Sequence, residues 1–175
     1  MKQKTYEKLN ASLIKIIQNT PYEEITVKLL CNEANITRKT FYNNYKSIDE
    51  FVKNIFINMF YEKCYSKIND ESYFESTEFI LTMIDIWNEY DKLFLALDKW
   101  NILEYFMKNN INNIIELIKE QFKDIYISKY KEYFIVCTYG NIANVCLTWL
   151  KKGKLESKEE LEIIIKRFIY HQDNL

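Results

Sequence analysis

The chain has 175 residues and a formal net charge of −1, because 24 lysines and arginines nearly balance 25 aspartates and glutamates. Apolar residues make up 48% of it, which is ordinary for a globular protein and excludes disorder as the dominant state. Two glycines and one proline are too few for the many turns of an all-β fold. The composition therefore predicts an all-α chain of one domain or two small ones.

The first two predicted helices lie on either side of the single proline. Leucines and isoleucines at helical spacing predict a helix over residues 4–19, which ends before Pro21. Thr26 is a suitable N-cap for a brief second helix over residues 27–32, because its hydroxyl can accept a hydrogen bond from the first turn.

A sharp turn and a third short helix follow. Asn35 stands at the turn, and asparagine adopts the left-handed conformation more readily than most residues other than glycine. Thr37 is the predicted N-cap of a helix over residues 38–44. This order suits a helix-turn-helix, in which the second helix braces the third and the third faces the major groove of DNA.

The rest of the chain is predicted to form longer amphipathic helices. A capping box of Ser47 with Glu50 opens the first of them, which extends to about residue 68. Gly153 is a candidate C-cap, and a second capping box, Ser157 with Glu160, opens the final helix. The other expected ranges are 73–88, 91–98, 102–122, 129–152 and 158–170.

Several functional classes find little support in the sequence. The four cysteines form no CxxC pair, and with a single histidine, His171, a structural zinc site is not expected. The cysteines are interpreted as small buried hydrophobes in a reducing cytoplasm, with a redox-sensing thiol as the alternative. They are Cys31, Cys64, Cys137 and Cys146. Without a glycine-rich phosphate loop or a nucleophile elbow the chain is not expected to be an enzyme or to hold a cofactor, although paired carboxylates could act in principle.

The N-terminus lacks the apolar core and cleavage site of a secretory signal, and no stretch is expected to span a membrane. A cytoplasmic protein is therefore expected. Charge is uneven along it: residues 1–53 hold nine lysines or arginines against six acidic residues, and the remainder is acidic. A basic head on an acidic body is the asymmetry expected where only the head meets a polyanion.

The stretch from Ile25 to Phe51, ITVKLLCNEANITRKTFYNNYKSIDEF, resembles the signature of the TetR family of bacterial transcriptional regulators. The match runs without a gap and includes the Thr-Phe-Tyr core at residues 40–42. The matching positions are Thr26, Val27, Leu30, Cys31, Ala34, Asn35, Ile36, Thr37, Thr40, Phe41, Tyr42, Tyr45, Ser47, Glu50 and Phe51. The alternative is that these helices are only a packing motif.

Geometry and the resemblance together predict the DNA contacts. Arg38 could bind a guanine bidentately, Thr40 a thymine methyl or a phosphate, and Tyr42 a phosphate through its hydroxyl, while Phe41 is expected in the core. The candidate DNA-binding residues are Thr26, Lys28, Thr37, Arg38, Lys39, Thr40, Tyr42, Asn43, Asn44 and Lys46.

Three positions depart from the family pattern. Asn35 replaces the usual glycine of the turn, and Cys31 replaces a small alanine, consistent with packing against the third helix. Ile48 replaces the usual lysine, which removes a phosphate contact and is expected to weaken DNA binding or change its salt dependence.

The resemblance implies a helix-turn-helix DNA-binding domain over residues 1–50 and a larger helical domain over residues 51–175 that binds an effector and dimerises. The stretch TWLKKGKLESKEELE, residues 148–162, is similar to TetR proteins related to dihydroxyacetone kinase regulators.

Apolar stripes on the last two helices suit a dimer in which two helical hairpins form a four-helix bundle. The predicted interface residues are Val136, Gly140, Ala143, Leu147, Leu150, Leu161, Ile164, Ile165 and Phe168. The alternative is that both stripes only close the core of the monomer.

An aromatic stretch in the middle of the chain could line a pocket for an apolar or aromatic effector, or could be plain core. Its residues are Trp87, Tyr90, Phe94, Trp100, Tyr105 and Phe106. Asp85, Asn88, Glu89 and Asp98 could be polar anchors there, or could equally be solvated.

These features predict a dimeric, ligand-responsive regulator, most often a repressor in this family, that binds a pseudo-palindromic DNA operator. The half-sites would lie about one turn, roughly 10 base pairs, or more apart. The effector, the operator and the target genes are not predicted. The alternative is an adaptor of the same fold that binds a partner protein and has weak or lost DNA binding. Ile48 and the near-neutral net charge favour this alternative.

Overall fold

The computed structural model describes residues 3–68, 71–121 and 129–170, and every regular element within these ranges is helical. The all-α prediction is therefore confirmed. The chain forms two compact units, one made of Met1–Asn58 with Lys92–Asn110 and the other of Met59–Asp91 with Ile111–Leu175. This packing division differs from a boundary at residue 50, because α6 and the start of α7 pack with the N-terminal helices. As a division of functions, residues 1–50 and 51–175 stay a prediction.

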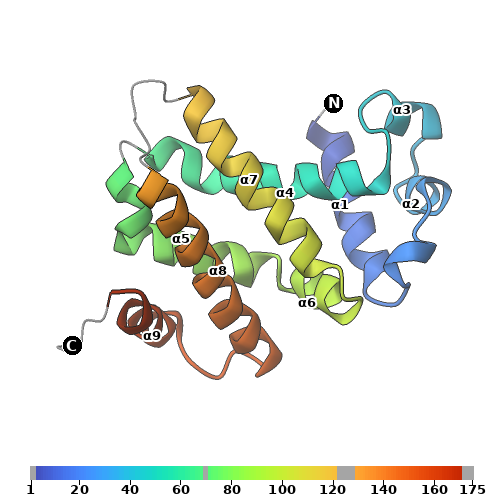
Figure 1. Cartoon of the computed structure of the whole chain (residues 1–175). Helices are drawn as coiled ribbons and strands as arrows, with labels where there is room; N and C mark the ends of the chain where they lie inside the picture. Colours follow the sequence, from blue (N-terminus) through green and yellow to red (C-terminus); the bar gives the residue numbers. More distant parts are fainter. Residues whose placement is uncertain (1–2, 69–70, 122–128, 171–175) are drawn as a thin grey trace. The chain divides into compact units, whose positions relative to one another are not determined.

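The first unit holds the N-terminal helices and the first half of the α6–α7 segment (Figure 1). Its elements are α1 (Gln3–Ile17), η1 (Tyr22–Glu24), α2 (Val27–Glu33), α3 (Arg38–Tyr42), the start of α4 (Ile48–Cys64), α6 (Asp91–Lys99) and the start of α7 (Leu103–Gln121).

Aromatic side chains join α3 and α4 in the core of the first unit. Phe41 and Phe51 are fully buried with ring centroids 6.1 Å apart, and Tyr45 lies 5.0 Å from Phe51. Burial of such rings contributes about 2 kcal/mol each. These contacts fix α3, a helix of only five residues that is too short to be stable by itself.

The second unit is organised around α5 (Thr77–Glu89), which packs against both α8 (Lys129–Lys151) and α9 (Lys158–Tyr170) (Figure 1). It also contains η2 (Tyr65–Lys67) and η3 (Glu71–Glu75). Trp87 of α5 is almost fully buried, as are Ile142 and Cys146 of α8. The side chain of Ser76 accepts a hydrogen bond from the backbone N–H of Phe79 at 3.1 Å, which caps α5.

The predicted helix ends are confirmed where a local capping interaction fixes the end of the helix. Gly153 ends α8 with φ of +77°, a conformation that glycine adopts without strain. Ser157 and Glu160 form the predicted capping box: the Ser157 N–H donates to Glu160 Oε2 at 2.8 Å, and the Glu160 N–H donates to Ser157 Oγ at 3.2 Å. In the box at α4, the Glu50 N–H donates to Ser47 Oγ at 3.1 Å, but the Glu50 carboxylate accepts from the N–H of Lys46.

Three predicted boundaries are wrong. The long helix ends at Cys64 and continues as η2, while α3 ends at Tyr42. The helix predicted from residue 73 begins at Thr77, because Ser76 caps it and η3 precedes it. His171 and the chain around it lie outside the described residues.

Among the described residues, the segment Glu132–Lys151 within α8 is long and apolar enough to cross a membrane by length and composition alone, a test that a core helix also passes. The same segment supplies core residues to the second unit, including Ile142, Cys146 and Trp149. Packing within the chain therefore accounts for part of its apolar character, while Val136 and Cys137 are exposed.

Candidate nucleic-acid interface

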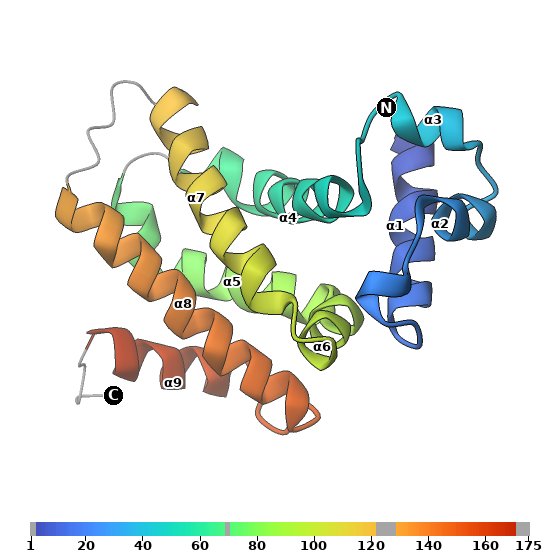
Figure 2. The same cartoon turned by 45° about the vertical axis from the view of Figure 1, so that its right-hand side comes forward.

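Helices α2 and α3 pack against each other, and α2 also packs against α1, in the order of a helix-turn-helix (Figure 2). The side chain of Thr26 caps α2 by accepting a hydrogen bond from the N–H of Leu29 at 3.1 Å. Asn35 has φ of +50°, and the N–H of Ile36 reaches back to the carbonyl of Cys31 at 3.0 Å. Asparagine therefore makes the left-handed turn for which the family uses glycine.

The first turn of α3 presents polar side chains outward while its apolar side chain points inward. Thr37 caps the helix by accepting from the N–H of Thr40 at 3.1 Å, and the two threonine hydroxyls lie 2.9 Å apart. Arg38 and Lys39 are exposed, and Phe41 is fully buried as predicted.

The remaining candidates continue this surface. Tyr42 is 56% exposed, and Asn43 and Lys46 are exposed as well. Asn44 is exposed too, but its side-chain amide donates to the carbonyl of Thr40 at 2.8 Å and so caps the end of α3. Of the candidate DNA-binding residues, only Thr40 is half-buried.

Positive charge on this surface is not neutralised. Among the described residues, no ion pair involves Lys28, Arg38, Lys39 or Lys46, although Lys15 is paired with Glu33 at 2.5 Å. Unpaired cations around an exposed short helix are what a phosphate backbone attracts.

Ile48 is buried at the start of α4 and therefore belongs to the core. The position that carries a lysine in the family pattern therefore has no charged side chain that could contact a phosphate here. Whether this weakens DNA binding stays a prediction.

Three of the four cysteines are buried, as predicted, and the prediction is wrong for Cys137, which is exposed. Burial raises the pKa of the Cys31 thiol, although the nearby charge of Arg38 opposes the shift. Burial also raises the pKa of Cys64 to about 11 and that of Cys146 further. The buried thiols are therefore protonated and unreactive at neutral pH.

The predicted aromatic pocket residues are divided between the two units. Trp87 and Tyr90 belong to the second unit, and Phe94, Trp100 and Phe106 belong to the first. Trp87, Phe94 and Phe106 are buried, which fits the alternative that they are plain core.

Near Phe94 and Phe106, Phe56 completes an aromatic cluster in the first unit, with centroids 5.7 Å and 6.0 Å away. Tyr105 is exposed, and the ammonium of Lys53 lies 5.0 Å from its ring centroid. Trp100 of the first unit and Tyr90 of the second are half-buried, and a role of either residue or of Tyr105 in effector binding stays a prediction.

Sequence reasoning missed a direct connection between the α6–α7 turn and the end of α1. The indole N–H of Trp100 donates to the carbonyl of Ile17 at 2.7 Å, and Lys99 Nζ donates to the carbonyl of Gln18 at 3.1 Å. Nearby, the Tyr22 hydroxyl donates to Asp49 Oδ1 at 2.5 Å. Partners 83 residues apart leave no periodic signal in the sequence.

Along α8 and α9 the predicted dimer residues fall into two groups. One group is buried within the chain, which fits the alternative that these stripes close the core of the monomer. It consists of Ala143, Leu150, Leu161 and Ile165. Of the others, the side chain of Val136 is 41% exposed, and Gly140, Leu147 and Ile164 are half-buried. The side chain of Phe168 lies outside the described residues.

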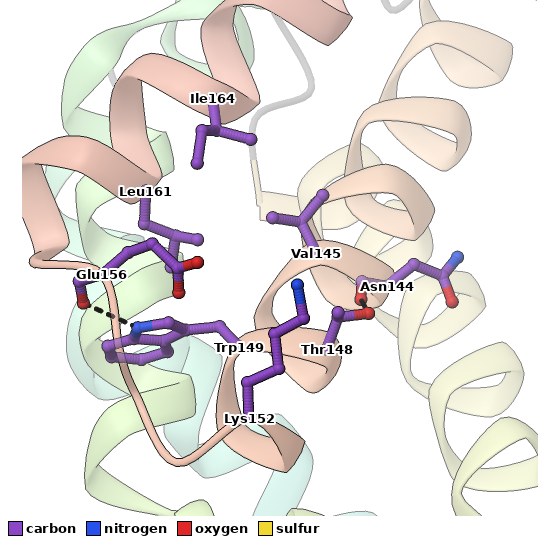
Figure 3. A pocket seen from close by; sticks show the side chains of 8 residues that line it. All are labelled: Asn144, Val145, Thr148, Trp149, Lys152, Glu156, Leu161 and Ile164. Atoms are coloured by element: carbon purple, nitrogen blue, oxygen red, sulfur yellow. Dashed lines mark hydrogen bonds between the residues drawn. The ribbon is translucent and has the colours of Figure 1, made fainter.

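A groove of about 300 Å³ lies between α8 and α9 (Figure 3). Val145, Leu161 and Ile164 supply its apolar lining, and the indole N–H of Trp149 is held by the carbonyl of Glu156 at 2.8 Å. A Cβ placed on Gly140 would meet nothing within 4 Å, so the chain's own packing does not require a glycine there.

No protein-family model matches the chain. It is 32% identical over 138 residues to the HTH-type dhaKLM operon transcriptional activator DhaS of Lactococcus lactis subsp. lactis (strain IL1403), covering 75% of this chain and 70% of that protein. The chain belongs to the TetR family of helix-turn-helix transcriptional regulators. It is a DNA-binding regulator, and its relatives are regulators and not enzymes.

Solved structures show the same fold over nearly the whole chain. The dihydroxyacetone kinase operon activator DhaS has a TM-score of 0.59 at 20% identity, with 96% of this chain and 95% of that chain covered. The fatty acid degradation regulator FadR from Bacillus halodurans has a TM-score of 0.62 at 15% identity, with 97% and 96% covered.

Proposed function

We propose that this TetR regulator is a cytoplasmic homodimer that represses transcription by binding a pseudo-palindromic operator through α3, and that a small-molecule effector releases it. Residues 1–50 would contact DNA, and residues 51–175 would bind the effector and dimerise. Catalysis has no part in this function. The proposal is supported above all by the exposed, unpaired cations on and around α3, with Arg38 and Lys39 at the start of the helix.

The proposed contacts divide between bases and phosphates. Arg38 and Thr40 would meet base edges, while Tyr42, Lys28 and Lys46 would meet phosphates. The hydroxyl of Thr26 accepts a capping bond through its oxygen, which leaves its hydrogen able to donate to a phosphate. The hydroxyls of Thr37 and Thr40 share one hydrogen bond, so the hydrogen of one of the two stays able to donate to DNA. Phosphate contacts are also proposed for Lys39, Asn43 and Asn44.

Dimerisation would join the outward faces of α8 and α9 from two copies. Val136, Gly140 and Leu147 offer the outward side of α8, and Ile164 lines the groove beside it. Small residues allow close approach of helices, and a second pair of helices would cover the groove between α8 and α9. The proposed spacing of the two recognition helices is about one DNA turn, roughly 10 base pairs, or a multiple of it.

Release requires that the effector bind the DNA-incompetent state better than the competent one. The hydrogen bonds from Trp100 and Lys99 to the end of α1 give a movement of the α6–α7 turn a direct route to the DNA-binding helices. Tyr22 adds a second connection, because its ring lies 5.5 Å from that of Phe106 in α7 while its hydroxyl bonds to Asp49 of α4.

Activation is the second candidate for the direction of control. The observation that favours it is the name of the Lactococcus relative, a transcriptional activator, at 32% identity. Both directions use the same DNA-binding surface and differ in where the operator lies relative to the promoter.

Fluorescence anisotropy with the DNA upstream of the protein's own gene, against a scrambled duplex of the same length, tests the proposal at moderate salt. Tight binding to the upstream duplex alone is expected. Equal and salt-sensitive binding to both duplexes would show only a basic surface, and no binding at low salt would support the partner-binding adaptor. A promoter-reporter fusion with and without the protein then distinguishes repression from activation.

A further inference from the structure

A short turn joins α3 to α4 (Figure 2), and Tyr45, which lies in this turn, is bonded to both helices. Its backbone N–H donates to the carbonyl of Phe41 in α3 at 3.0 Å. Its hydroxyl donates to Asn54 Oδ1 at 2.8 Å, and Asn54 lies in the second turn of α4. One residue therefore connects the end of the helix that is proposed to read DNA with the helix that follows it.

The side chain of Tyr45 faces the core and not the DNA-binding surface. The residue is only 9% exposed, and its ring packs against Phe41 and Phe51 with centroids 5.6 Å and 5.0 Å away. Burial raises the pKa of Tyr45 to about 12, so its hydroxyl keeps the proton that it donates to Asn54 at neutral pH. Tyr45 is therefore placed to hold α3, whereas the exposed Tyr42 is placed to contact DNA.

The amide of Asn54 is held from its other side as well. Asn58, one turn further along α4, donates from Nδ2 to the same Asn54 Oδ1 at 3.2 Å. An amide oxygen has two lone pairs, and these two donors use both of them. The three side chains thus form a hydrogen-bonded row beside α4, in which the amide of Asn54 cannot turn away from Tyr45 without losing two hydrogen bonds.

The ring contacts and the hydrogen bond restrain α3 in different ways. The rings of Phe41, Tyr45 and Phe51 keep α3 close to α4, but hydrophobic burial has no preferred direction and permits a small rotation. A hydrogen bond weakens steeply away from its preferred distance and angle, so it also fixes orientation. Because α3 has only five residues, a rotation at its end would displace every side chain that the helix presents.

We propose that Tyr45 is a positioning residue for sequence reading, because its hydrogen bond to Asn54 sets the orientation in which α3 presents Arg38 to base edges. The inference rests on the proposed function, in which α3 reads the operator. Contacts to base edges require placement within about 0.5 Å. A lysine ammonium contacts a phosphate as a point charge on a flexible stem and tolerates small shifts. Loss of the Tyr45 hydroxyl therefore reduces discrimination between DNA sequences and leaves affinity for DNA in general unchanged.

Tyr45→Phe keeps the buried ring and removes only the hydroxyl. Fluorescence anisotropy compares it with wild type on a duplex that wild type selects from a random pool and on a scrambled duplex, over a range of salt concentrations. The ratio of the two affinities is expected to fall about threefold to tenfold. The affinity for the scrambled duplex and the dependence of affinity on salt are expected to stay as in wild type. An equal loss on both duplexes, or a weaker salt dependence, would overturn the inference, because the first indicates a damaged fold and the second a lost phosphate contact.

Variants of Asn54 test whether the hydroxyl acts through this bond. Asn54→Leu removes the acceptor and is expected to lower the affinity ratio, and its combination with Tyr45→Phe should lower it no further, because both changes remove the same hydrogen bond. Asn54→Asp keeps an acceptor and is expected to preserve the ratio, although its negative charge weakens binding to both duplexes alike. Tyr61→Phe, at an exposed tyrosine further along α4, is the matched control. Additive losses in the double variant would contradict a shared bond.

A measurement without DNA completes the test. Amide hydrogen exchange of the free chain is expected to be faster in α3 of Tyr45→Phe than in α3 of wild type, with the protection of α1 unchanged. Unchanged protection of α3, or an unchanged affinity ratio in Tyr45→Phe, would contradict the role of Tyr45 and leave the proposed function in place. A wild type that selects no duplex from the random pool would contradict the proposed function, and this inference with it.

Discussion

The hydrogen bond from Trp100 to the end of α1 can be removed with little change of shape by Trp100→Phe. The phenyl ring keeps much of the apolar surface but cannot donate to the carbonyl of Ile17, which now accepts a 2.7 Å, partly buried bond. A net hydrogen bond contributes about 1 kcal/mol, and an acceptor left without a partner adds part of its desolvation cost. We expect the free energy of unfolding to fall by about 1–2 kcal/mol.

The assay is urea unfolding followed by circular dichroism at one fixed protein concentration, because a dimer's stability depends on concentration. Amide hydrogen exchange locates the effect, and faster exchange is expected in the last turn of α1. Lys99→Met is the matched control, since its bond to Gln18 is exposed and its loss should cost less than about 0.5 kcal/mol. Equal unfolding free energies for the two variants, with α1 protection unchanged, would show that the Trp100 hydrogen bond does not stabilise the end of α1.

Three further outcomes are expected. Asn35→Gly should raise the unfolding free energy by a few tenths of a kcal/mol to about 1 kcal/mol in thermal melts, because φ is +50° and glycine adopts it without strain; a loss of stability would contradict this. Cys137 should be the first thiol to react with a water-soluble disulfide reagent in the native protein, and equally fast modification of the buried thiols would show that their burial is wrong. Val136→Glu should shift the mass in sedimentation from dimer toward monomer, whereas Ala11→Glu, exposed on α1, should not; a dimer unaffected by the first change would remove α8 from the interface.

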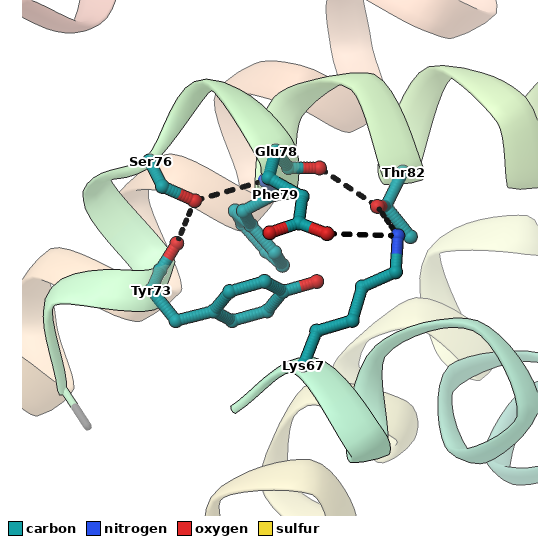
Figure 4. Close-up of polar contacts among 6 residues, drawn as sticks. All are labelled: Lys67, Tyr73, Ser76, Glu78, Phe79 and Thr82. Carbon is teal, nitrogen blue, oxygen red and sulfur yellow. Dashed lines mark hydrogen bonds and ion pairs between the residues drawn. The ribbon is translucent and has the colours of Figure 1, made fainter. Parts of the chain in front are cut away.

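Local chemistry made much of the fold predictable from the sequence. Thr26, Thr37 and Ser157 cap the helices that their positions predict, because a capping hydroxyl and the backbone it binds lie within three residues. Asn35 marks the turn for the same reason. The predicted start near residue 73 was wrong because Ser76 caps the helix at Thr77 (Figure 4), and the pattern of apolar residues does not show this cap.

The candidate sites were less predictable, because they depend on contacts distant in sequence. The helical spacing of apolar residues predicts that Trp87 points inward, but it cannot distinguish a filled core from the wall of a pocket. Asp85 was considered only as a possible anchor, and its partner Lys158 lies 73 residues away.

The central claim is that the surface around α3 reads an operator. The most direct measurement compares wild type, the double variant Arg38→Ala with Tyr42→Phe, and the control Lys108→Ala for binding to the upstream duplex across a range of salt concentrations. The double variant is expected to lose at least about tenfold in affinity and most of its preference over a scrambled duplex, while the control binds like wild type. Unchanged affinity and preference in the double variant would contradict the claim that α3 is the DNA-reading surface.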